Sequence, residues 1–177
     1  MPELPFSLER GREVLGRTPD VLRSLLFGLS PEWTAARETA GSWSPYEVVG
    51  HLLYTDESDW LDRTQIILDH GTTRTFEPVD REAGFSRYLH LGLDDILDRF
   101  ATVRAHNLTL LDELLEPGDL LRRGVHPEFG EVTLNQLLAT WVVHDLNHQN
   151  QVVKTMAKQY TRAIGPWRQL LPIVDAP

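Results

Sequence analysis

Two histidines near the end of the chain are the residues best suited to chemistry. His144 and His148 are four residues apart, so on a helix both imidazole rings project from one face and can reach a common ion. Zinc takes imidazole nitrogens at about 2.0–2.1 Å, and a helix presets such a pair cheaply. Their stripe continues through Trp141 and Leu137, which favours a position near a buried face over the alternative of a solvated polar stripe. The pair therefore predicts a divalent metal site.

A third ligand is expected from elsewhere, since two histidines hold a divalent ion weakly. His51 lies among apolar residues, where an imidazole needs a partner or a metal. His70 follows a helical pattern, whose terminal dipole accounts for it without a function. Periodicity favours His51 modestly and leaves the other three histidines open: His90, His106 and His126.

Two other metal chemistries fit the sequence poorly. Residues 144–148 have the frame of the zinc-peptidase motif, but Asp145 replaces the glutamate and neither His nor Glu follows His148. Asp145 is instead expected at the surface, or orienting an imidazole, or pairing with a base. A di-iron bundle would need Glu-x-x-His pairs on two helices, and the sequence has none.

Capping signals place the histidines on two long helices. Ser44-Pro45-Tyr46-Glu47 combines an N-cap, a first-turn proline and a capping box, and the helix it begins is predicted to run to His70-Gly71. Acidic residues at 56, 57, 59 and 62 are expected on its solvated face. Thr133 with Gln136 starts the second helix, whose apolar face continues for about six turns.

Two further helices complete the predicted core. Asp94 is expected to cap one that ends before Pro117-Gly118, and residues 8–29 read as a helix bent or broken at Pro19. Residues 72–91 are expected to form a crossover, and residues 119–132 a loop or hairpin too short to found a sheet. The pattern predicts an all-α four-helix bundle.

Composition limits the class of protein. The 177 residues suit one domain, with a core at 5–160 and an apolar tail at 161–177 that docks on it. A net charge of −9 opposes binding to nucleic acid or to an anionic membrane. The absence of cysteine excludes disulfides, a catalytic thiol and thiolate zinc sites. With no signal-like N-terminus and no long apolar run, a cytoplasmic location is expected.

The sequence also resembles a known family. Residues 41–52, together with Trp60 and Arg63, are similar to the second-helix signature of the DinB/YfiT-like bundle proteins, and residues 130–152 are similar to their last helix. The resemblance implies an up-down-down-up bundle, often a homodimer. It also implies one divalent ion (Zn, Ni, Fe or Mn) held by one histidine of the second helix and two of the last: His51, His144 and His148.

The function implied by the resemblance is thiol chemistry. Some relatives conjugate low-molecular-weight thiols such as bacillithiol or mycothiol to electrophiles, one group isomerises maleylpyruvate with mycothiol, and many have no assigned activity. Three neutral histidines leave an open metal position, which would lower the pKa of a bound thiol or water. We therefore expect a thiol S-transferase acting on a small-molecule electrophile, with a metal-dependent hydrolase or a non-catalytic metal-containing, ligand-binding stress protein as alternatives. Because the chain lacks cysteine, the sulfur must come from a cosubstrate.

Overall fold

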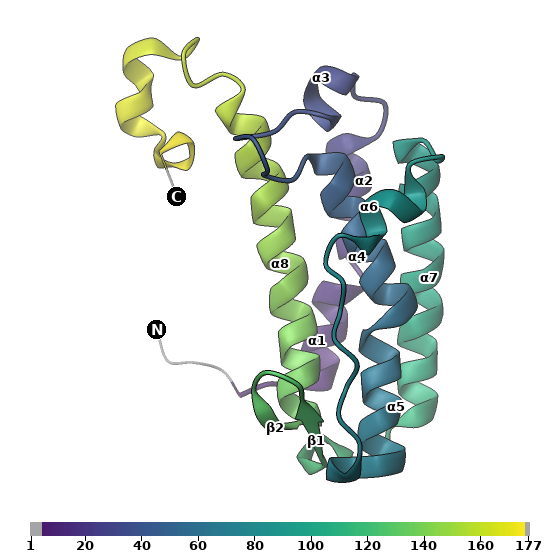
Figure 1. Cartoon of the computed structure of the whole chain (residues 1–177). Coiled ribbons are helices and arrows are strands. Elements are labelled where there is room, and N and C mark those ends of the chain that lie inside the picture. The colour runs from purple at the N-terminus through teal and green to yellow at the C-terminus, as the bar shows by residue number, and fades with distance from the viewer. Residues whose placement is uncertain (1–4, 176–177) are drawn as a thin grey trace.

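The computed structural model describes residues 5–175 and consists mainly of helices packed as a four-helix bundle (Figure 1). In that view α1 and α2 run up the bundle, α4 and α5 run down, α7 runs down again after a long crossover, and α8 returns upward. The predicted up-down-down-up bundle is therefore confirmed. The helices are α1 (Leu8–Leu15), α2 (Thr18–Leu26), α3 (Pro31–Thr34), α4 (Pro45–Ser58), α5 (Trp60–His70), α6 (Ala83–Tyr88), α7 (Leu93–Leu114) and α8 (Leu134–Lys158).

Short elements join the helices. Strands β1 (Arg123–His126) and β2 (Gly130–Thr133) pair as an antiparallel hairpin, with His126 opposite Gly130. This hairpin lies at the lower end of the bundle, where α8 begins (Figure 1). Four 3₁₀ helices complete the described elements: η1 (Gly71–Thr73), η2 (Asp119–Leu121), η3 (Gly165–Leu170) and η4 (Pro172–Val174).

Both predicted capping boxes are present at the helices that carry the histidines. At α4 the Ser44 hydroxyl accepts from the Glu47 amide at 3.3 Å, and the Ser44 amide donates to Glu47 Oε2 at 2.8 Å. At α8 the Gln136 amide donates to Thr133 Oγ1 at 3.1 Å, and the Thr133 amide donates to Gln136 Oε1 at 2.8 Å. Each box satisfies two backbone donors that the first helical turn leaves unpaired.

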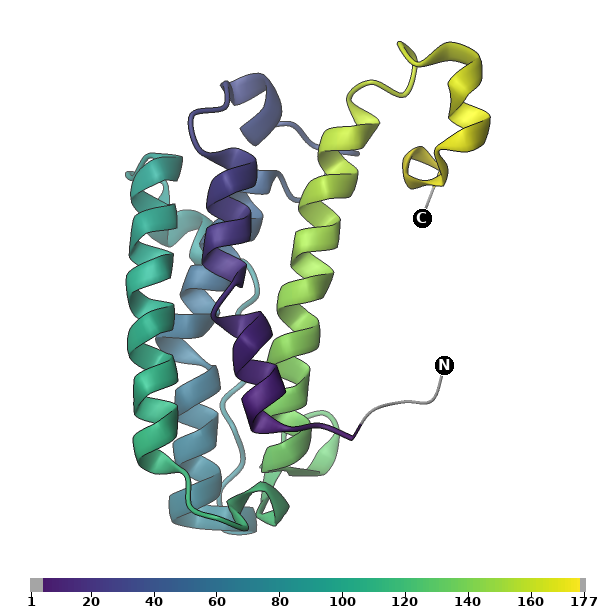
Figure 2. The same ribbon diagram turned by 180° about the vertical axis from the view of Figure 1, so that it is seen from behind.

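Helix boundaries differ from the predictions at three places. The expected helix over 45–70 is interrupted at Asp59, whose φ of −133° and ψ of −66° separate α4 from α5. Asp94 is not the N-cap of α7: Gly92 takes that position, and its amide donates to Asp95 Oδ2 at 3.3 Å. The N-terminal helix breaks before Thr18 rather than at Pro19, because a proline is tolerated in the first turn of a new helix. Figure 2 shows this break from behind.

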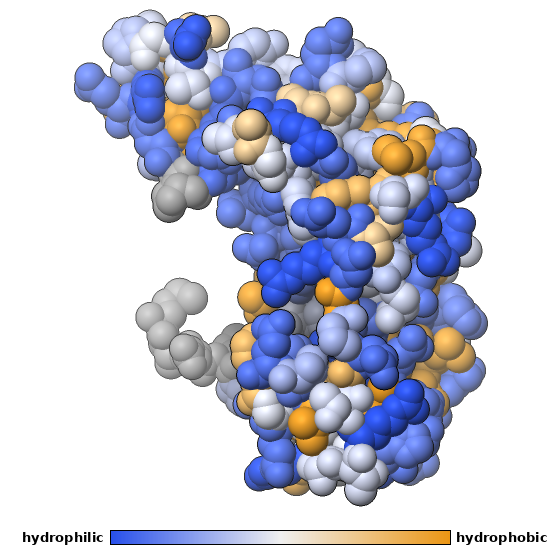
Figure 3. Space-filling view, viewed as in Figure 1, coloured by the Kyte–Doolittle hydropathy of each residue, from blue (hydrophilic) through white to orange (hydrophobic). Residues whose placement is uncertain are grey.

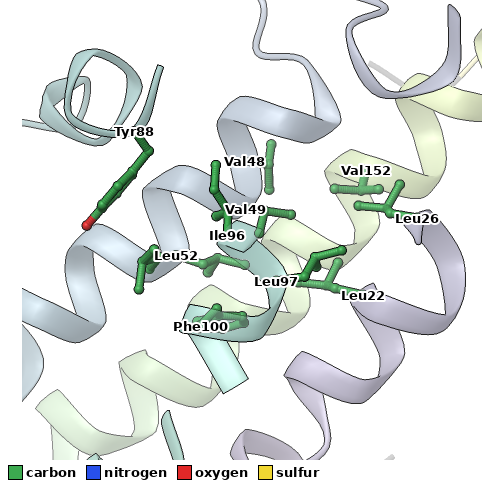
Figure 4. Packing of buried hydrophobic residues seen from close by; sticks show 11 residues of the cluster. Leu22, Leu26, Val48, Val49, Leu52, Tyr88, Ile96, Leu97, Phe100 and Val152 are labelled. Atoms are coloured by element: carbon green, nitrogen blue, oxygen red, sulfur yellow. The ribbon is translucent and has the colours of Figure 1, made fainter. Parts of the chain in front are cut away.

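The bundle is held by two clusters of buried hydrophobic residues. One occupies the half shown in Figure 4 and joins α2, α4, α7 and α8 through side chains such as Leu22, Leu52, Phe100 and Val152. The other occupies the half nearer the hairpin and includes Trp141. Each fully buried Leu or Phe contributes about 1.5–3 kcal/mol of hydrophobic free energy.

The C-terminal segment docks on the bundle only in part. Val174 in η4 is buried and η4 contacts α8. Trp167 and Leu170 are 65% and 74% exposed, and the segment projects from the body of the protein (Figure 3). The surface in this view is mostly hydrophilic, with hydrophobic side chains scattered over it. Across residues 5–175, no helix combines the length and the apolar character needed to cross a membrane.

Candidate metal centre

The three histidines singled out in the sequence meet between α4 and α8. One ring nitrogen from each of His51, His144 and His148 lies within 4.8 Å of the corresponding nitrogens of the other two. The Nε2 atoms of His51 and His144 are 3.1 Å apart. The four remaining histidines are not part of this group. The third ligand candidate favoured by periodicity is thus the histidine that the fold brings to the pair.

Hydrogen bonds fix two of the three rings. His51 Nδ1 lies 3.0 Å from the carbonyl oxygen of Arg81, and His148 Nδ1 lies 2.9 Å from Gln151 Oε1. Both oxygens are acceptors, so each Nδ1 carries its ring's proton and each Nε2 presents a lone pair. His144 Nδ1 is buried without a hydrogen-bond partner, and this ring packs instead against the edge of Trp60 at a centroid distance of 5.2 Å.

The donor set fits a divalent ion. Two imidazole nitrogens that each bind one ion at about 2.0–2.1 Å are about 2.9–3.4 Å apart when the nitrogen–metal–nitrogen angle lies between about 90° and the tetrahedral value. The 3.1 Å separation of His51 and His144 falls in this range. His51 Nε2 presents a lone pair to His144 Nε2, so a proton on the His144 ring or a cation shared by the two rings can fill the space between these nitrogens. The Nδ1 hydrogen bonds of His51 and His148 are the kind that orient ligating imidazoles in metal sites.

Burial keeps the three rings neutral. Burial, with smaller effects from neighbouring positive groups, lowers the pKa of His51 to about 4 and that of His144 to about 2. Burial also lowers the pKa of His148, against the hydrogen bond that its Nδ1–H donates to Gln151, which raises it. Neutral imidazole is the form that ligates a metal. The rings are therefore in the ligating form at neutral pH.

A buried ion cluster connects the two helices that carry the histidines. Arg104 of α7 donates from Nε and Nη2 to both carboxylate oxygens of Asp56 on α4, at 2.6 and 2.9 Å. It also donates from Nη1 and Nη2 to Asp145 on α8, at 2.5 and 3.2 Å, and from Nη1 to the carbonyl of Leu15 on α1 at 2.8 Å. The side chains of Arg104, Asp56 and Asp145 are at most 1% exposed. One guanidinium on α7 thus links this helix to α1, α4 and α8. Because two carboxylates face one guanidinium, the cluster as a whole carries a negative charge near the histidines.

These contacts correct two sequence expectations. Asp56 and Asp59 were placed on a solvated helix face, but both are buried. Asp59 faces Arg63 across 2.5 Å, and burial raises the pKa of each carboxyl to about 6. Asp145 is buried rather than at the surface, and it pairs with a base, Arg104, which was one of the alternatives predicted for it.

A cavity of 430 Å³ opens onto the histidines. Its lining includes all three of them. A second cavity of 330 Å³ adjoins it, and the two share four lining residues: Asp59, Arg63, Pro78 and Val79. The Trp43 ring forms one wall of the first cavity and stacks on His148 at 5.7 Å with an interplanar angle of 4°. The centre therefore has space beside it for small molecules.

The model of the DinB superfamily matches residues 15–152. The chain belongs to the DinB superfamily. Solved structures that resemble it include two four-helix bundle proteins. YfiT from Bacillus subtilis, described as a probable metal-dependent hydrolase with an unusual four-helix bundle topology, is 20% identical with a TM-score of 0.73, over 93% of each chain. TT2238, a four-helix bundle protein, is 20% identical with a TM-score of 0.54, over 80% of this chain and 94% of its own. No curated protein matches the sequence.

Several residues around this DinB-type centre were not found from the sequence. Thr55 and Asp59 follow His51 at four-residue intervals and line the same cavity. Helical spacing from His51 would have been the signal for them. His126 and Phe129 reach the cavity from the hairpin, whose short and poorly periodic sequence contains no such signal. Arg104 pairs with residues 48 and 41 positions away, so no local pattern indicates its partners.

Proposed function

We propose that this DinB protein is a divalent-metal-dependent enzyme in which His51, His144 and His148 hold the ion, and that its reaction transfers a small-molecule thiol to an electrophile. The observation that carries the proposal is the convergence of three neutral histidines at the wall of a 430 Å³ cavity. When bound, a divalent ion with an open coordination position lowers the pKa of a thiol or water that reaches it.

The surroundings favour an enzyme over a purely structural metal site. A structural site is closed by a fourth protein ligand. Among the described residues, the group that could hold an ion has three members, and no fourth histidine or carboxylate joins them. Open space adjoins the three rings, because the same three residues line the cavity.

Two features support transfer between two substrates. The chain has no cysteine, so sulfur must arrive on a cosubstrate, for which bacillithiol- or mycothiol-like thiols are the candidates. The adjoining 330 Å³ cavity shares a wall with the first, which provides room for a second molecule next to the one at the histidines. The role of the chain's own residues is then to hold the ion and to orient both reactants.

Hydrolysis is the second candidate. Asp59 lines the cavity, and burial raises the pKa of its carboxyl to about 6. A carboxylate with such a pKa is suited to accept a proton from water near neutral pH. YfiT is likewise described as a probable metal-dependent hydrolase.

The test begins with metal analysis of protein purified without a histidine tag. The metal-loaded protein is then incubated with epoxides and activated halides, with and without a low-molecular-weight thiol. Thiol-dependent loss of electrophile that stops on chelation, and that His144→Ala abolishes, would support the transferase. The matched control is His90→Ala, which removes an exposed histidine.

Other outcomes identify the alternatives. Turnover of an ester or amide with metal and water alone contradicts the transferase and supports the hydrolase. Stoichiometric metal binding without turnover of either set of substrates contradicts both the transferase and the hydrolase, and it supports a binding protein.

A further inference from the structure

The cavity at the histidines is elongated, and its far end has a different chemistry. It is lined by His51 and Thr55 of α4 and by Asp59, the residue that follows this helix; from His51 to Asp59 the chain advances eight steps, or about 12 Å at the helical rise. The wall continues to Arg63 in α5. At this end β1 contributes His126, whose ring contacts Phe76 at a centroid distance of 6.2 Å, while the Arg63 guanidinium lies 5.3 Å over the same Phe76 ring.

The proton of His126 is held on one nitrogen by the hairpin turn. The backbone amides of Glu128 and Phe129 both donate to His126 Nδ1, at 3.1 and 3.3 Å. An imidazole nitrogen that accepts hydrogen bonds carries a lone pair, so the proton of the neutral ring is on Nε2. Across residues 5–175, no hydrogen bond to this Nε2 is present, and the residue lines the cavity. The hairpin therefore presents a preoriented N–H donor to the cavity.

Two features keep this donor in place and neutral. The Phe129 ring stacks on the imidazole at 4.5 Å with an interplanar angle of 18°. Burial and the nearby Arg63 lower the pKa of His126, against a smaller effect of Glu128. At neutral pH the ring thus offers a hydrogen bond from a fixed direction.

We propose that His126 anchors the substrate: its Nε2–H binds a carboxylate or carbonyl oxygen of a small molecule whose reacting group lies at the three histidines. Arg63 lies near this end of the cavity but pairs with Asp59, so its charge does not by itself select a carboxylate over a carbonyl oxygen. The substrate class is then a small molecule that carries an oxygen acceptor at the end remote from its reacting atom. The identity of the reaction rests on the proposed function, but the anchoring contact does not.

The test uses two variants that divide the functions of the imidazole. In His126→Asn the side-chain oxygen replaces Nδ1 and can still accept from the turn amides, as asparagine does in turns, but nothing donates from the Nε2 position. In His126→Gln the amide N–H replaces the Nε2 donor, and the acceptor for the turn is lost. His90→Asn, at an exposed position, is the matched control.

Benzoate and benzamide are the probes, titrated into zinc-loaded protein and followed by nitrogen-15 NMR of the histidine rings. The expected spectrum shows His126 as the Nε2–H tautomer, and its N–H resonance moves as benzoate is added. His126→Asn is expected to weaken benzoate binding about 10- to 100-fold, the loss typical of one hydrogen bond to a charged group. His126→Gln and His90→Asn should stay within a few-fold of the unmodified protein.

The two probes also separate the two oxygen types. Tighter binding of benzoate than of benzamide indicates a carboxylate, and equal binding indicates that a carbonyl suffices. An Nδ1–H tautomer, unchanged benzoate affinity in His126→Asn, or no binding of either probe would overturn the proposal. None of these measurements requires turnover, so their failure is distinct from failure of the proposed reaction.

Discussion

Replacing Arg104 by methionine tests whether the buried ion cluster holds the bundle together. The substitution keeps the length and most of the volume of the side chain but removes its five hydrogen bonds: two to Asp56, two to Asp145 and one to the carbonyl of Leu15. Both carboxylates then remain buried without a counter-charge. Breaking a buried ion pair by removing one partner costs about 3–5 kcal/mol of unfolding free energy. For a domain of this size that corresponds to a fall in melting temperature of about 6–20 °C.

Urea denaturation followed by far-ultraviolet circular dichroism at pH 7 measures this cost. Arg99→Met is the matched control, because Arg99 lies on the same helix and pairs with Glu57 at 2.6 Å, yet its side chain is 47% exposed. An exposed pair contributes at most about 1 kcal/mol. The triple variant Asp56→Leu, Arg104→Met, Asp145→Leu should regain most of the loss, since it buries no charge. A loss in Arg104→Met no larger than that in Arg99→Met would refute the reasoning.

Three further outcomes are expected. Isothermal titration of the metal-free protein with zinc should show one binding site. Its zinc affinity should fall more than about 100-fold in His51→Ala, His144→Ala or His148→Ala, and an unchanged affinity in any of these variants would exclude that residue as a ligand. The pKa of His51 is about 4 when folded against 6.5 as its ordinary value, so below pH 6.5 the unfolded chain binds a proton that the folded metal-free protein does not. The unfolding free energy of the metal-free protein, minus that of the His51→Gln variant, should thus fall by about 3 kcal/mol from pH 7 to pH 4. The raised pKa values of Asp56 and Asp59 act in the opposite sense, but they are common to both proteins and cancel in the difference. A difference that stays constant with pH would contradict the burial argument. Gly84→Ala should destabilise the protein by about 1–3 kcal/mol, since a Cβ there would lie 2.7 Å from the Gly50 carbonyl oxygen. The control is Gly50→Ala, which should cause no loss of stability because its Cβ would meet nothing closer than 3.5 Å. Equal melting temperatures for the two variants would show that α4 and α6 can move apart freely.

Local patterns in the sequence predicted the bundle, and together with the family resemblance they predicted the three histidines that the fold brings together. The capping boxes at Ser44 and Thr133 form as predicted because each depends on residues within one turn. His144 and His148 share a face because four-residue spacing is a property of any α-helix. His51 was favoured because an imidazole among apolar residues requires a partner, and the family resemblance named the same residue.

The tertiary structure decided everything that depends on residues distant in the chain. The sequence placed Asp56 and Asp59 in solvent because acidic side chains are usually exposed, but Arg104 and Arg63 make their burial possible. It left His126 among several open candidates, since nothing in a four-residue strand indicates which ring nitrogen faces a turn or a cavity. Local hydrogen bonds and helical periodicity act over a few residues and can be read from their order. The pairing of buried charges and the shape of a cavity arise only when helices far apart in the sequence pack together, and so they required the folded protein.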